Sequence, residues 1–275
     1  MRDSTSPHHA IAAALGVAAT FDAADETGQR VQFLVDRLAA TRTKALVLGI
    51  SGGVDSTTTG RLCQLAVERS RAAGHLAQFV AMRLPYGQQR DADDAERALD
   101  FIRPDLALRV DIAPAVDAMV DALTAAGFSL GDPAAHDFAV GNVKARQRMI
   151  AQYAVANALN GLVVGTDHAA EAVMGFFTKH GDGACDVAPL SGLTKRRVRA
   201  IAAHLGAPRA LVGKVPTADL ESLRPLRPDE AALGVSYEEI DDFLEGKPVP
   251  TQAAAKIVAT YERTAHKRTM PAVPD

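Results

Sequence analysis

The sequence has little of what would place the chain in a membrane or in an oxidising compartment. It holds only two cysteines in 275 residues, Cys63 and Cys185, and they form neither a CxxC pair nor a cysteine–histidine metal spacing. Two isolated cysteines favour a reduced, cytoplasmic setting. No apolar run approaches the roughly 20 residues that a bilayer-spanning helix needs. Residues 1–24 also lack the basic start and long apolar run of a signal peptide. We therefore expect a cytoplasmic protein with no membrane contact.

An excess of positive charge is also missing, since the net charge is −3 and the isoelectric point is near 6.2. Proteins that bind nucleic acid usually carry a broad basic face, so we expect no nucleic-acid partner. A nucleotide substrate in a local basic pocket stays compatible with this charge. The 48% hydrophobic and 23% charged residues are ordinary for a globular protein and supply a sizeable core. The length fits one large α/β domain or two small ones.

Short apolar runs alternate with amphipathic stretches over the first part of the chain. Strands are expected at 44–50, 76–82, 106–112 and 161–166. Helices are expected at 24–40, 55–73, 91–102, 115–126 and 137–160, and later at 194–205, 236–245 and 251–265. This alternation predicts βαβ units with right-handed crossovers and a parallel sheet. Residues 1–23 are expected to be loose, and 83–93, 179–192 and 213–235 are expected to be long loops of the kind that form lids or binding segments.

The strongest local signal is Ser51-Gly-Gly-Val-Asp-Ser56, which follows a predicted buried strand and precedes a predicted helix. Its two glycines tolerate positive φ, and successive N–H groups at a helix N-terminus form a nest for anions. Its two serine hydroxyls can donate to phosphate oxygens. Asp55 would repel a phosphate unless Mg²⁺ lies between them, so the segment predicts a magnesium and phosphate site. The simpler alternative is a glycine-rich turn whose serine or aspartate caps the helix.

The spacing differs from that of the common nucleotide-binding motifs. It lacks the Gly-Lys-Ser/Thr ending of the P-loop and the three glycines of the dinucleotide fingerprint. The SGGxDS pattern instead resembles the pyrophosphate-binding loop of the ATP pyrophosphatases. Those enzymes split ATP between its α and β phosphates and adenylate an oxygen of a second substrate. Taken alone, the motif indicates this superfamily and leaves the substrate open.

Further segments narrow the resemblance to one family. Residues 141–152 read GNVKARQRMIAQ and residues 165–183 read GTDHAAEAVMGFFTKHGDG, which closely resemble segments of the NAD synthetases. Shorter matches follow the family order at 84–87 (LPYG), 216–221 (PTADLE), 233–246 (LGVSYEEIDDFLEG) and 265–268 (AHKR). The chain is identified as a member of the ammonia-dependent NAD synthetase family over about residues 24–268. We therefore expect a single synthetase domain within residues 1–275.

The resemblance implies four catalytic residues. Glu171 corresponds to a metal ligand and, with Asp55, would hold Mg²⁺ over the triphosphate of ATP. Asp182 resembles an acidic residue near the nicotinate end that guides ammonium or accepts its proton. Lys195 matches a contact on the ATP side. Thr166, at the carboxyl end of a predicted buried strand where open α/β sheets bind ligands, matches a threonine that binds ATP.

The remaining binding residues follow from the same resemblance. The implied ATP-binding set is Gly49, Ile50, Ser51, Gly52, Gly53, Val54, Asp55, Ser56, Thr166, Lys195 and Thr217. The implied set for deamido-NAD is Arg146, Lys179, Asp186, His266 and Lys267. An arginine fork suits a phosphate or carboxylate, and Asp186 suits ribose hydroxyls or a ring donor.

Simpler explanations exist for several of these residues. Glu171 is alternatively a solvated helix carboxylate, and Asp182 is alternatively a turn former. Lys195 is the first of three consecutive basic residues, which is also typical of an exposed helix start. His266 and Lys267 are alternatively a charged tail.

As a whole, the resemblance implies an α/β fold with a doubly wound parallel sheet flanked by helices, of the adenine nucleotide α-hydrolase type. It also implies a homodimer with sites at the subunit interface, and Mg²⁺ as the cofactor. In the implied reaction, the nicotinate carboxylate of deamido-NAD attacks the α-phosphorus of ATP and gives an acyl-adenylate and pyrophosphate. Ammonia then displaces AMP and gives NAD. Such catalysis rests on positioning and charge neutralisation, without a covalent nucleophile.

Free ammonia is the expected nitrogen donor. A glutamine-dependent version needs an amidotransferase domain with a catalytic cysteine, and with the ATP loop at residue 51 this sequence leaves no room for one. Two rival classes stay open: another adenylating enzyme, such as a GMP synthetase or tRNA thiolation domain, and a non-enzymatic ATP sensor. The lack of a basic face and of a catalytic cysteine pair counts against the tRNA enzymes. Retention of Asp55, Glu171 and Lys195 counts against the sensor.

Overall fold

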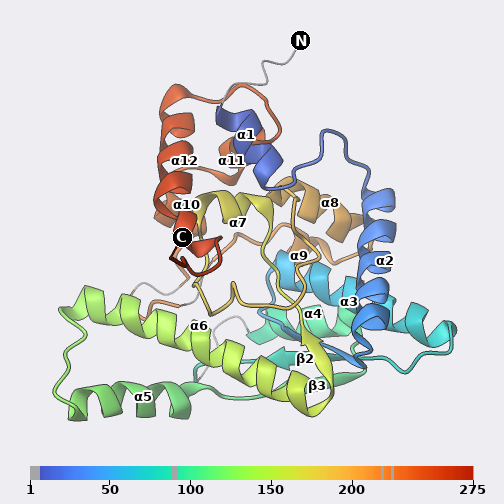
Figure 1. Cartoon of the computed structure of the whole chain (residues 1–275), viewed down its shortest axis with the longest axis horizontal. Helices are drawn as coiled ribbons and strands as arrows, with labels where there is room; N and C mark the ends of the chain where they lie inside the picture. The colour runs from blue at the N-terminus through green and yellow to red at the C-terminus, as the bar shows by residue number, and fades with distance from the viewer. Residues whose placement is uncertain (1–6, 88–91, 218–219, 224–225, 275) are drawn as a thin grey trace.

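The computed structural model of the chain describes residues 7–87, 92–217, 220–223 and 226–274 (Figure 1). The described residues form a sheet of four parallel strands, with β1 at Ala45–Gly49, β2 at Gln78–Arg83, β3 at Leu106–Arg109 and β4 at Gly161–Val163. The spatial order is β3-β2-β1-β4, and Val47 of β1 lies opposite both Val80 and Val163. The chain therefore winds from β1 out to β3 and returns to the far side of β1.

Helices surround this sheet and follow it in sequence. They are α1 (Pro7–Ala14), α2 (Ala23–Thr41), α3 (Val54–Ala72), α4 (Ala92–Ile102), α5 (Ala113–Ala125), α6 (Pro133–Ala158), α7 (Ala169–Met174), α8 (Lys195–His204), α9 (Arg209–Val212), α10 (Asp229–Leu233), α11 (Tyr237–Leu244), α12 (Thr251–Arg263) and the 3₁₀ turn η1 (Ala265–Lys267). Among the described residues, no helix combines the length and the apolar character needed to cross a membrane.

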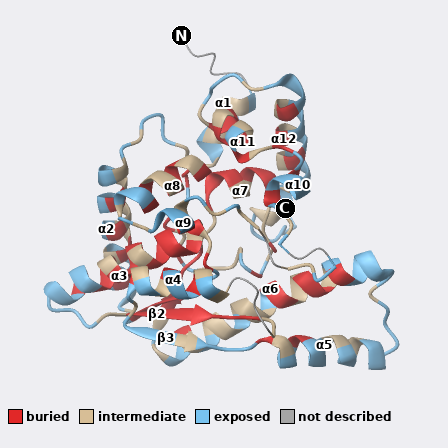
Figure 2. Cartoon of the chain, turned by 180° about the vertical axis from the view of Figure 1, so that it is seen from behind, coloured by how far each residue is buried: buried red, intermediate tan, exposed pale blue. Residues whose placement is uncertain are grey.

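Both faces of β1 and β2 are covered, which explains the continuous apolar runs of these strands, whereas the edge strand β3 is largely exposed. Leu46 and Leu48 of β1 pack into a core with α2, α3, α4 and α8. Val47, which points the other way, packs into a second core with α5 and α6. All three side chains are buried, and Figure 2 shows the buried strand residues between the two helical layers. The expected doubly wound α/β fold is confirmed, because α3 and α4 lie on one face and α5 and α6 on the other.

A third apolar cluster joins α1, α7, α11 and α12 beyond the edge of the sheet (Figure 1). Its members include Ile11, Val173, Tyr237 and Ile257. The expectation that residues 1–23 are loose is wrong for Pro7–Ala14, which is helical and buries Ile11. An alanine-rich segment with one buried isoleucine has almost no apolar periodicity, so the periodic pattern alone did not predict this helix, although alanine has the highest helix propensity.

Other elements also differ from the bounds expected from the sequence, where the edge of the sheet is irregular. The strand expected at 161–166 ends at Val163. The Val164 N–H still donates to the Val47 carbonyl of β1 at 2.9 Å, and Val164 also forms an isolated parallel bridge with Val187. The segment 213–235, expected to be one long loop, contains the helix α10. The bridge between Val164 and Val187 aligns the loop that follows β4 with residues 185–187. That loop forms one wall of the site described below.

Candidate active site

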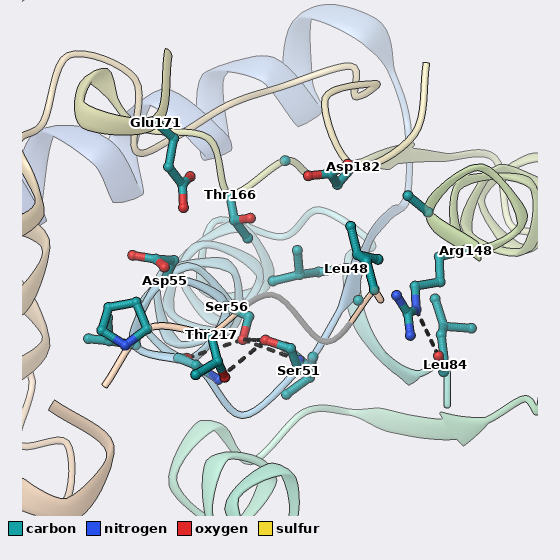
Figure 3. A pocket seen from close by; sticks show the side chains of 18 of the residues that line it. Leu48, Ser51, Asp55, Ser56, Leu84, Arg148, Thr166, Glu171, Asp182 and Thr217 are labelled. Atoms are coloured by element: carbon teal, nitrogen blue, oxygen red, sulfur yellow. Dashed lines mark hydrogen bonds between the residues drawn. The ribbon is translucent and has the colours of Figure 1, made fainter. Parts of the chain in front are cut away.

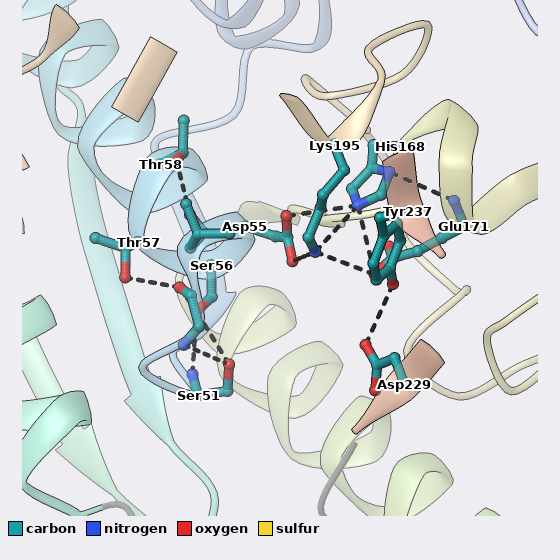
Figure 4. Close-up of polar contacts among 12 residues, drawn as sticks. Ser51, Asp55, Ser56, Thr57, Thr58, His168, Glu171, Lys195, Asp229 and Tyr237 are labelled. Carbon is teal, nitrogen blue, oxygen red and sulfur yellow. Dashed lines mark hydrogen bonds and ion pairs between the residues drawn. The ribbon is translucent and has the colours of Figure 1, made fainter. Parts of the chain in front are cut away.

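The turn from β1 into α3 lies at the carboxyl edge of the sheet, where strand order reverses between β1 and β4. The Ser51 and Ser56 hydroxyl oxygens lie 3.1 Å apart, and the Gly53 N–H donates to Ser51 Oγ at 3.2 Å. The Thr57 hydroxyl donates to the Gly53 carbonyl at 2.8 Å (Figure 4). These bonds fix a tight turn that directs the N-terminus of α3 toward the crevice, where open α/β sheets bind ligands.

Glycine at position 52 is required by both conformation and space. Its φ is +83°, which side chains rarely adopt, and a Cβ there would lie 2.6 Å from the backbone nitrogen of Ala95. The turn thus packs directly on the first residues of α4. Residue 52 supports the turn from behind and does not line the cavity described next.

A cavity of about 300 Å³ opens in front of this turn (Figure 3). Its walls include all of the residues predicted to bind ATP except Gly52, namely Gly49, Ile50, Ser51, Gly53, Val54, Asp55, Ser56, Thr166, Lys195 and Thr217. Glu171 and Asp182 line it as well. Segments that are far apart in sequence are therefore gathered around one space.

The cavity is also lined by residues that were not predicted from the sequence. Arg148 and Gln152 lie one turn apart on α6 and face it, with Arg148 Nε donating to the Leu84 carbonyl at 3.0 Å and Gln152 accepting from the Gly49 N–H at 2.7 Å. Both residues belong to the 141–152 segment used for the resemblance. Arg148 and Gln152 are four residues apart and share one helix face with Lys144. This spacing could have predicted from the sequence that they face the same site.

Two carboxylates and a lysine meet at one end of the cavity (Figure 4). The Lys195 ammonium lies 2.7 Å from Asp55 Oδ2 and 4.0 Å from Glu171 Oε1. It also lies 4.8 Å from the ring centre of Tyr237, a cation–π distance. Lys195 is only 1% exposed, so the alternative of a basic, exposed helix start is wrong for this residue.

Burial and mutual repulsion set the charges of this cluster. Burial alone would raise the pKa of Asp55, but the Lys195 ammonium beside it holds that pKa below its ordinary value. Burial, and then repulsion from Asp55, raises the pKa of Glu171. Burial also raises the pKa of Asp182, whose carboxylate accepts the Thr178 N–H at 2.9 Å. With both ionised, Asp55 and Glu171 carry more negative charge than the single Lys195 ammonium neutralises, and a further bound cation would favour that ionised form of Glu171.

His168, which the sequence reasoning missed, completes the cluster. Its Nε2 lies 3.5 Å from Asp55 Oδ1 and 3.5 Å from Glu171 Oε1. Burial and then the Lys195 charge lower the pKa of His168 to about 3, so the ring is neutral. One potential ligand atom from each of Asp55, His168 and Glu171 lies within 4.8 Å of the others, which is compact enough for a metal ion.

The residues predicted to bind deamido-NAD lie outside this cavity. Arg146 Nη2 donates to the Lys179 carbonyl at 3.2 Å, and Lys179 Nζ donates to the His266 carbonyl at 2.6 Å. These three residues therefore form one connected group at the surface. Lys267 is turned inward, where its ammonium donates to the Gly175 and Phe177 carbonyls at 2.9 and 2.7 Å. Since η1 packs on the loop after α7, the C-terminal residues are part of the folded structure.

Asp186 lies apart from that group. One of its oxygens accepts the Val163 N–H at 2.7 Å, and the other lies 3.4 Å from the Tyr153 hydroxyl. In this arrangement, its carboxylate supports the end of β4. Its predicted contact with substrate stays a prediction.

The fold and the cavity together define an α/β protein with a nucleotide-sized site at the switch point of a doubly wound sheet. The sequence profile of the NAD synthase family matches residues 26–271. The chain belongs to the NAD synthase family, and the resemblance predicted from its motifs is confirmed.

Individual relatives agree with this membership. The chain is 68% identical over 260 residues to the NH₃-dependent NAD⁺ synthetase of Streptomyces coelicolor, covering 94% of each protein. The crystal structure of NAD⁺ synthetase from Burkholderia pseudomallei matches with a TM-score of 0.85 and 59% identity, over 98% of this chain and 99% of that one. The NMN synthetase from Francisella tularensis matches with a TM-score of 0.81 and 32% identity, over 93% and 100%.

Proposed function

We propose that this chain is a ligase that makes NAD from deamido-NAD, ATP and free ammonia. The observation that carries this proposal is the 68% identity, over 94% of both chains, to an NH₃-dependent NAD⁺ synthetase. The similarity to an NMN synthetase is far lower, at 32% identity. This difference favours the dinucleotide over the mononucleotide as the substrate.

ATP occupies the cavity in front of the β1–α3 turn in this proposal. The N-terminus of α3 supplies N–H groups and the positive end of the helix dipole, both of which favour phosphate. The Lys195 side chain lies at one end of the same cavity, and Lys214, which is 2.8 Å from Asp94, contributes a second cation to its wall. Two cations and a helix N-terminus suit a triphosphate.

Asp55 and Glu171 would hold Mg²⁺ beside that triphosphate. Their fit rests on Asp55 Oδ1, which is buried and has no hydrogen-bond partner among the described residues. Carboxylate oxygens are also the ligands that Mg²⁺ prefers. When bound, the ion would neutralise charge on the phosphates and on departing pyrophosphate.

The proposed reaction has two balanced steps. A nicotinate carboxylate oxygen forms a bond to the α-phosphorus, and the bond from that phosphorus to pyrophosphate breaks. Ammonia then attacks the carbonyl carbon, and AMP leaves with the oxygen that joined it to the acyl group. A proton must leave the attacking nitrogen, and Asp182, a cavity carboxylate with a raised pKa, is suited to accept it.

We also propose that two copies form a homodimer through α5 and α6. Phe138 and Ile150 on α6 are 63% and 51% exposed, and Arg146 lies between them at helical spacing on the same face. On α5, Met119 is 52% exposed. Exposed large apolar side chains on the two neighbouring helices favour burial in an interface, which would bring Arg146 and its substrate contact to the boundary between subunits.

The dimer is tested with Phe138→Glu/Ile150→Glu, measured by light scattering after size exclusion. The wild-type chain should have twice the mass of the variant, and the variant should lose use of deamido-NAD. A monomeric, active wild-type chain would overturn the shared site.

A cytoplasmic location is proposed as well, and it is supported by the free thiols of Cys63 and Cys185. The whole chain is proposed to act as one synthetase domain, since the family profile spans residues 26–271.

The function is tested by incubating the purified chain with ATP, Mg²⁺ and ammonium. Deamido-NAD should be converted to NAD with equal amounts of AMP, and nicotinic acid mononucleotide should be converted far more slowly. Replacing ammonium by glutamine in ammonia-free buffer should stop the reaction. Faster conversion of the mononucleotide would change the substrate assignment, and activity with glutamine would change the nitrogen donor.

A further inference from the structure

The N-terminus of α8 is capped by a residue of another helix. Thr194 is the N-cap residue, yet its hydroxyl does not cap α8 and instead donates to Glu245 Oε1 at 2.9 Å. The first two N–H groups of α8, those of Lys195 and Arg196, donate to Asp241 Oδ1 and Oδ2 at 2.9 and 2.7 Å. A carboxylate is favourable here because it meets unpaired N–H groups and the positive end of the helix dipole. Asp241 therefore fixes the position at which α8 begins.

The helix that carries Asp241 also contacts the far end of the Lys195 side chain. Tyr237 lies one turn before Asp241 on the same face of α11, and its ring centre is 4.8 Å from Lys195 Nζ. Figure 4 shows this ring beside the lysine. Asp241 is 2% exposed, so its hydrogen bonds to α8 are shielded from water. One helix thus holds both the backbone and the ammonium of Lys195.

The hydrogen bonds of Asp241 affect the ATP cavity only indirectly. Lys195 lines this cavity, whereas Asp241 is not among the residues that line it. Because Lys195 is the first residue of α8, a shift of the start of this helix carries the lysine with it. Loss of the Asp241 carboxylate would therefore displace the ammonium that now lies 2.7 Å from Asp55.

We propose that Asp241 is a positioning residue that holds the first turn of α8 and thereby fixes Lys195 in the ATP cavity. This inference rests on the proposed function, in which Lys195 contacts ATP. Asp241 acts through Lys195 and needs no contact with either substrate. A displacement of about 1 Å at a reacting group can lower a rate about 100-fold, so the effect of this positioning is measurable.

Asp241→Asn and Asp242→Asn form a matched pair on α11. Asp241→Asn keeps the size of the side chain but has only one oxygen to accept the two N–H groups. Asp242→Asn removes the same charge from the next residue, which pairs with the Arg196 guanidinium at 2.7 Å and so contacts a side chain of α8. Asp241→Asn should lower kcat/KM for ATP about 10- to 100-fold and leave the KM for deamido-NAD nearly unchanged. Asp242→Asn should leave both nearly unchanged.

A double-mutant cycle with Lys195→Met separates positioning from a general effect on folding. The readout is ATP binding with Mg²⁺ present, measured by calorimetry well below the Tm of each variant, because it requires no turnover. Lys195→Met should weaken ATP binding about 10-fold or more. The double variant Lys195→Met/Asp241→Asn should bind ATP as weakly as Lys195→Met alone, since the residue through which Asp241 acts is already absent. A further loss in the double variant, equal to the loss that Asp241→Asn causes alone, would overturn the proposal.

Two other results would overturn it as well. One is a wild-type kcat/KM for ATP in Asp241→Asn, and the other is an equal loss in Asp241→Asn and Asp242→Asn. Asp241→Glu keeps both carboxylate oxygens and provides the test if Asp241→Asn does not fold. Its additional methylene moves the cap, so kcat/KM for ATP should fall here too, and a wild-type value would overturn the proposal.

Lys195→Met distinguishes this inference from the function on which it rests. If Lys195→Met makes NAD at the wild-type rate, the proposed contact of Lys195 with ATP is wrong, and the positioning role of Asp241 is overturned with it. If Lys195→Met loses activity and Asp241→Asn does not, the proposed function stands and only the role of Asp241 is wrong. If the wild-type chain makes no NAD, the proposed function is wrong, and the cycle of ATP binding still decides the role of Asp241.

Discussion

Removal of the Lys195 ammonium is the most informative perturbation of the ligand-free site. Lys195→Met keeps most of the side-chain volume but leaves Asp55 and Glu171 without the cation that lies 2.7 and 4.0 Å from them. Breaking one partner of a buried ion pair costs about 3–5 kcal/mol, because the other charge stays buried and unpaired. Lys195 is 1% exposed, so water offers little compensation.

This free energy corresponds to a large thermal shift. For a chain of this size, 1 kcal/mol lowers Tm by roughly 2–4 °C, so Lys195→Met should lower Tm by about 6–20 °C in EDTA. Added Mg²⁺ should recover part of the loss, since a cation bound only by the folded state stabilises it. Urea unfolding at neutral pH measures the same change as a free energy.

Two controls make the result specific. Lys214→Met removes a cation from another wall of the cavity, where the lysine pairs with Asp94 in a more exposed setting. It should cost about 0–1 kcal/mol. The double variant Lys195→Met/Asp55→Asn should be more stable than Lys195→Met alone, because the unpaired carboxylate is removed as well. A loss equal to that of Lys214→Met, or no recovery in the double variant, would show that Lys195 does not act as the counterion of the buried carboxylates.

Three further predictions concern the turn, the pH dependence and the substrate. Gly52→Ala should weaken ATP binding measured by calorimetry and destabilise the chain more than Gly74→Ala, because both residues have positive φ but only the Gly52 Cβ would collide with backbone; equal effects of the two would contradict this. Burial raises the pKa of Asp241 to about 6, so the wild-type chain should gain stability relative to Asp241→Asn as pH falls from 7 to 4.5, by up to about 1.4 kcal/mol per pH unit in urea unfolding. The opposite slope would mean that the folded state favours the ionised carboxylate. Arg146→Ala should raise the KM for deamido-NAD at least tenfold while ATP binding stays nearly intact, since Arg146 lies outside the cavity; equal damage to both would indicate a structural role.

Much of the fold could be predicted because the central strands of its sheet are buried on both faces. The run 44–50 is apolar throughout, and it became β1 with side chains in two separate cores. The bounds of the long helices differ from the expected ones by only a few residues, although α3 and α6 show little apolar periodicity. The segment that forms α1 was not predicted as a helix, because a single buried isoleucine produces no apolar period.

The site residues could be predicted where both the residue type and its place in a sequence motif indicate a function. Asp55 and Glu171 were assigned from motifs, and the structure brings both to one cavity with Lys195. His168 stands three residues before Glu171, yet a lone histidine gives no hint that its ring turns inward toward two carboxylates. That orientation depends on the packing of α7 against α11, which is a tertiary contact.

The fate of one oxygen atom shows whether NAD is formed through an acyl-adenylate. Deamido-NAD labelled with ¹⁸O in its nicotinate carboxylate is incubated with the purified chain, ATP, Mg²⁺ and ammonium. The masses of the products are then measured by mass spectrometry. Each NAD formed should be accompanied by one AMP that carries one ¹⁸O, with none in pyrophosphate and no ADP. Label in pyrophosphate, or ADP in place of AMP, would contradict synthesis through an acyl-adenylate.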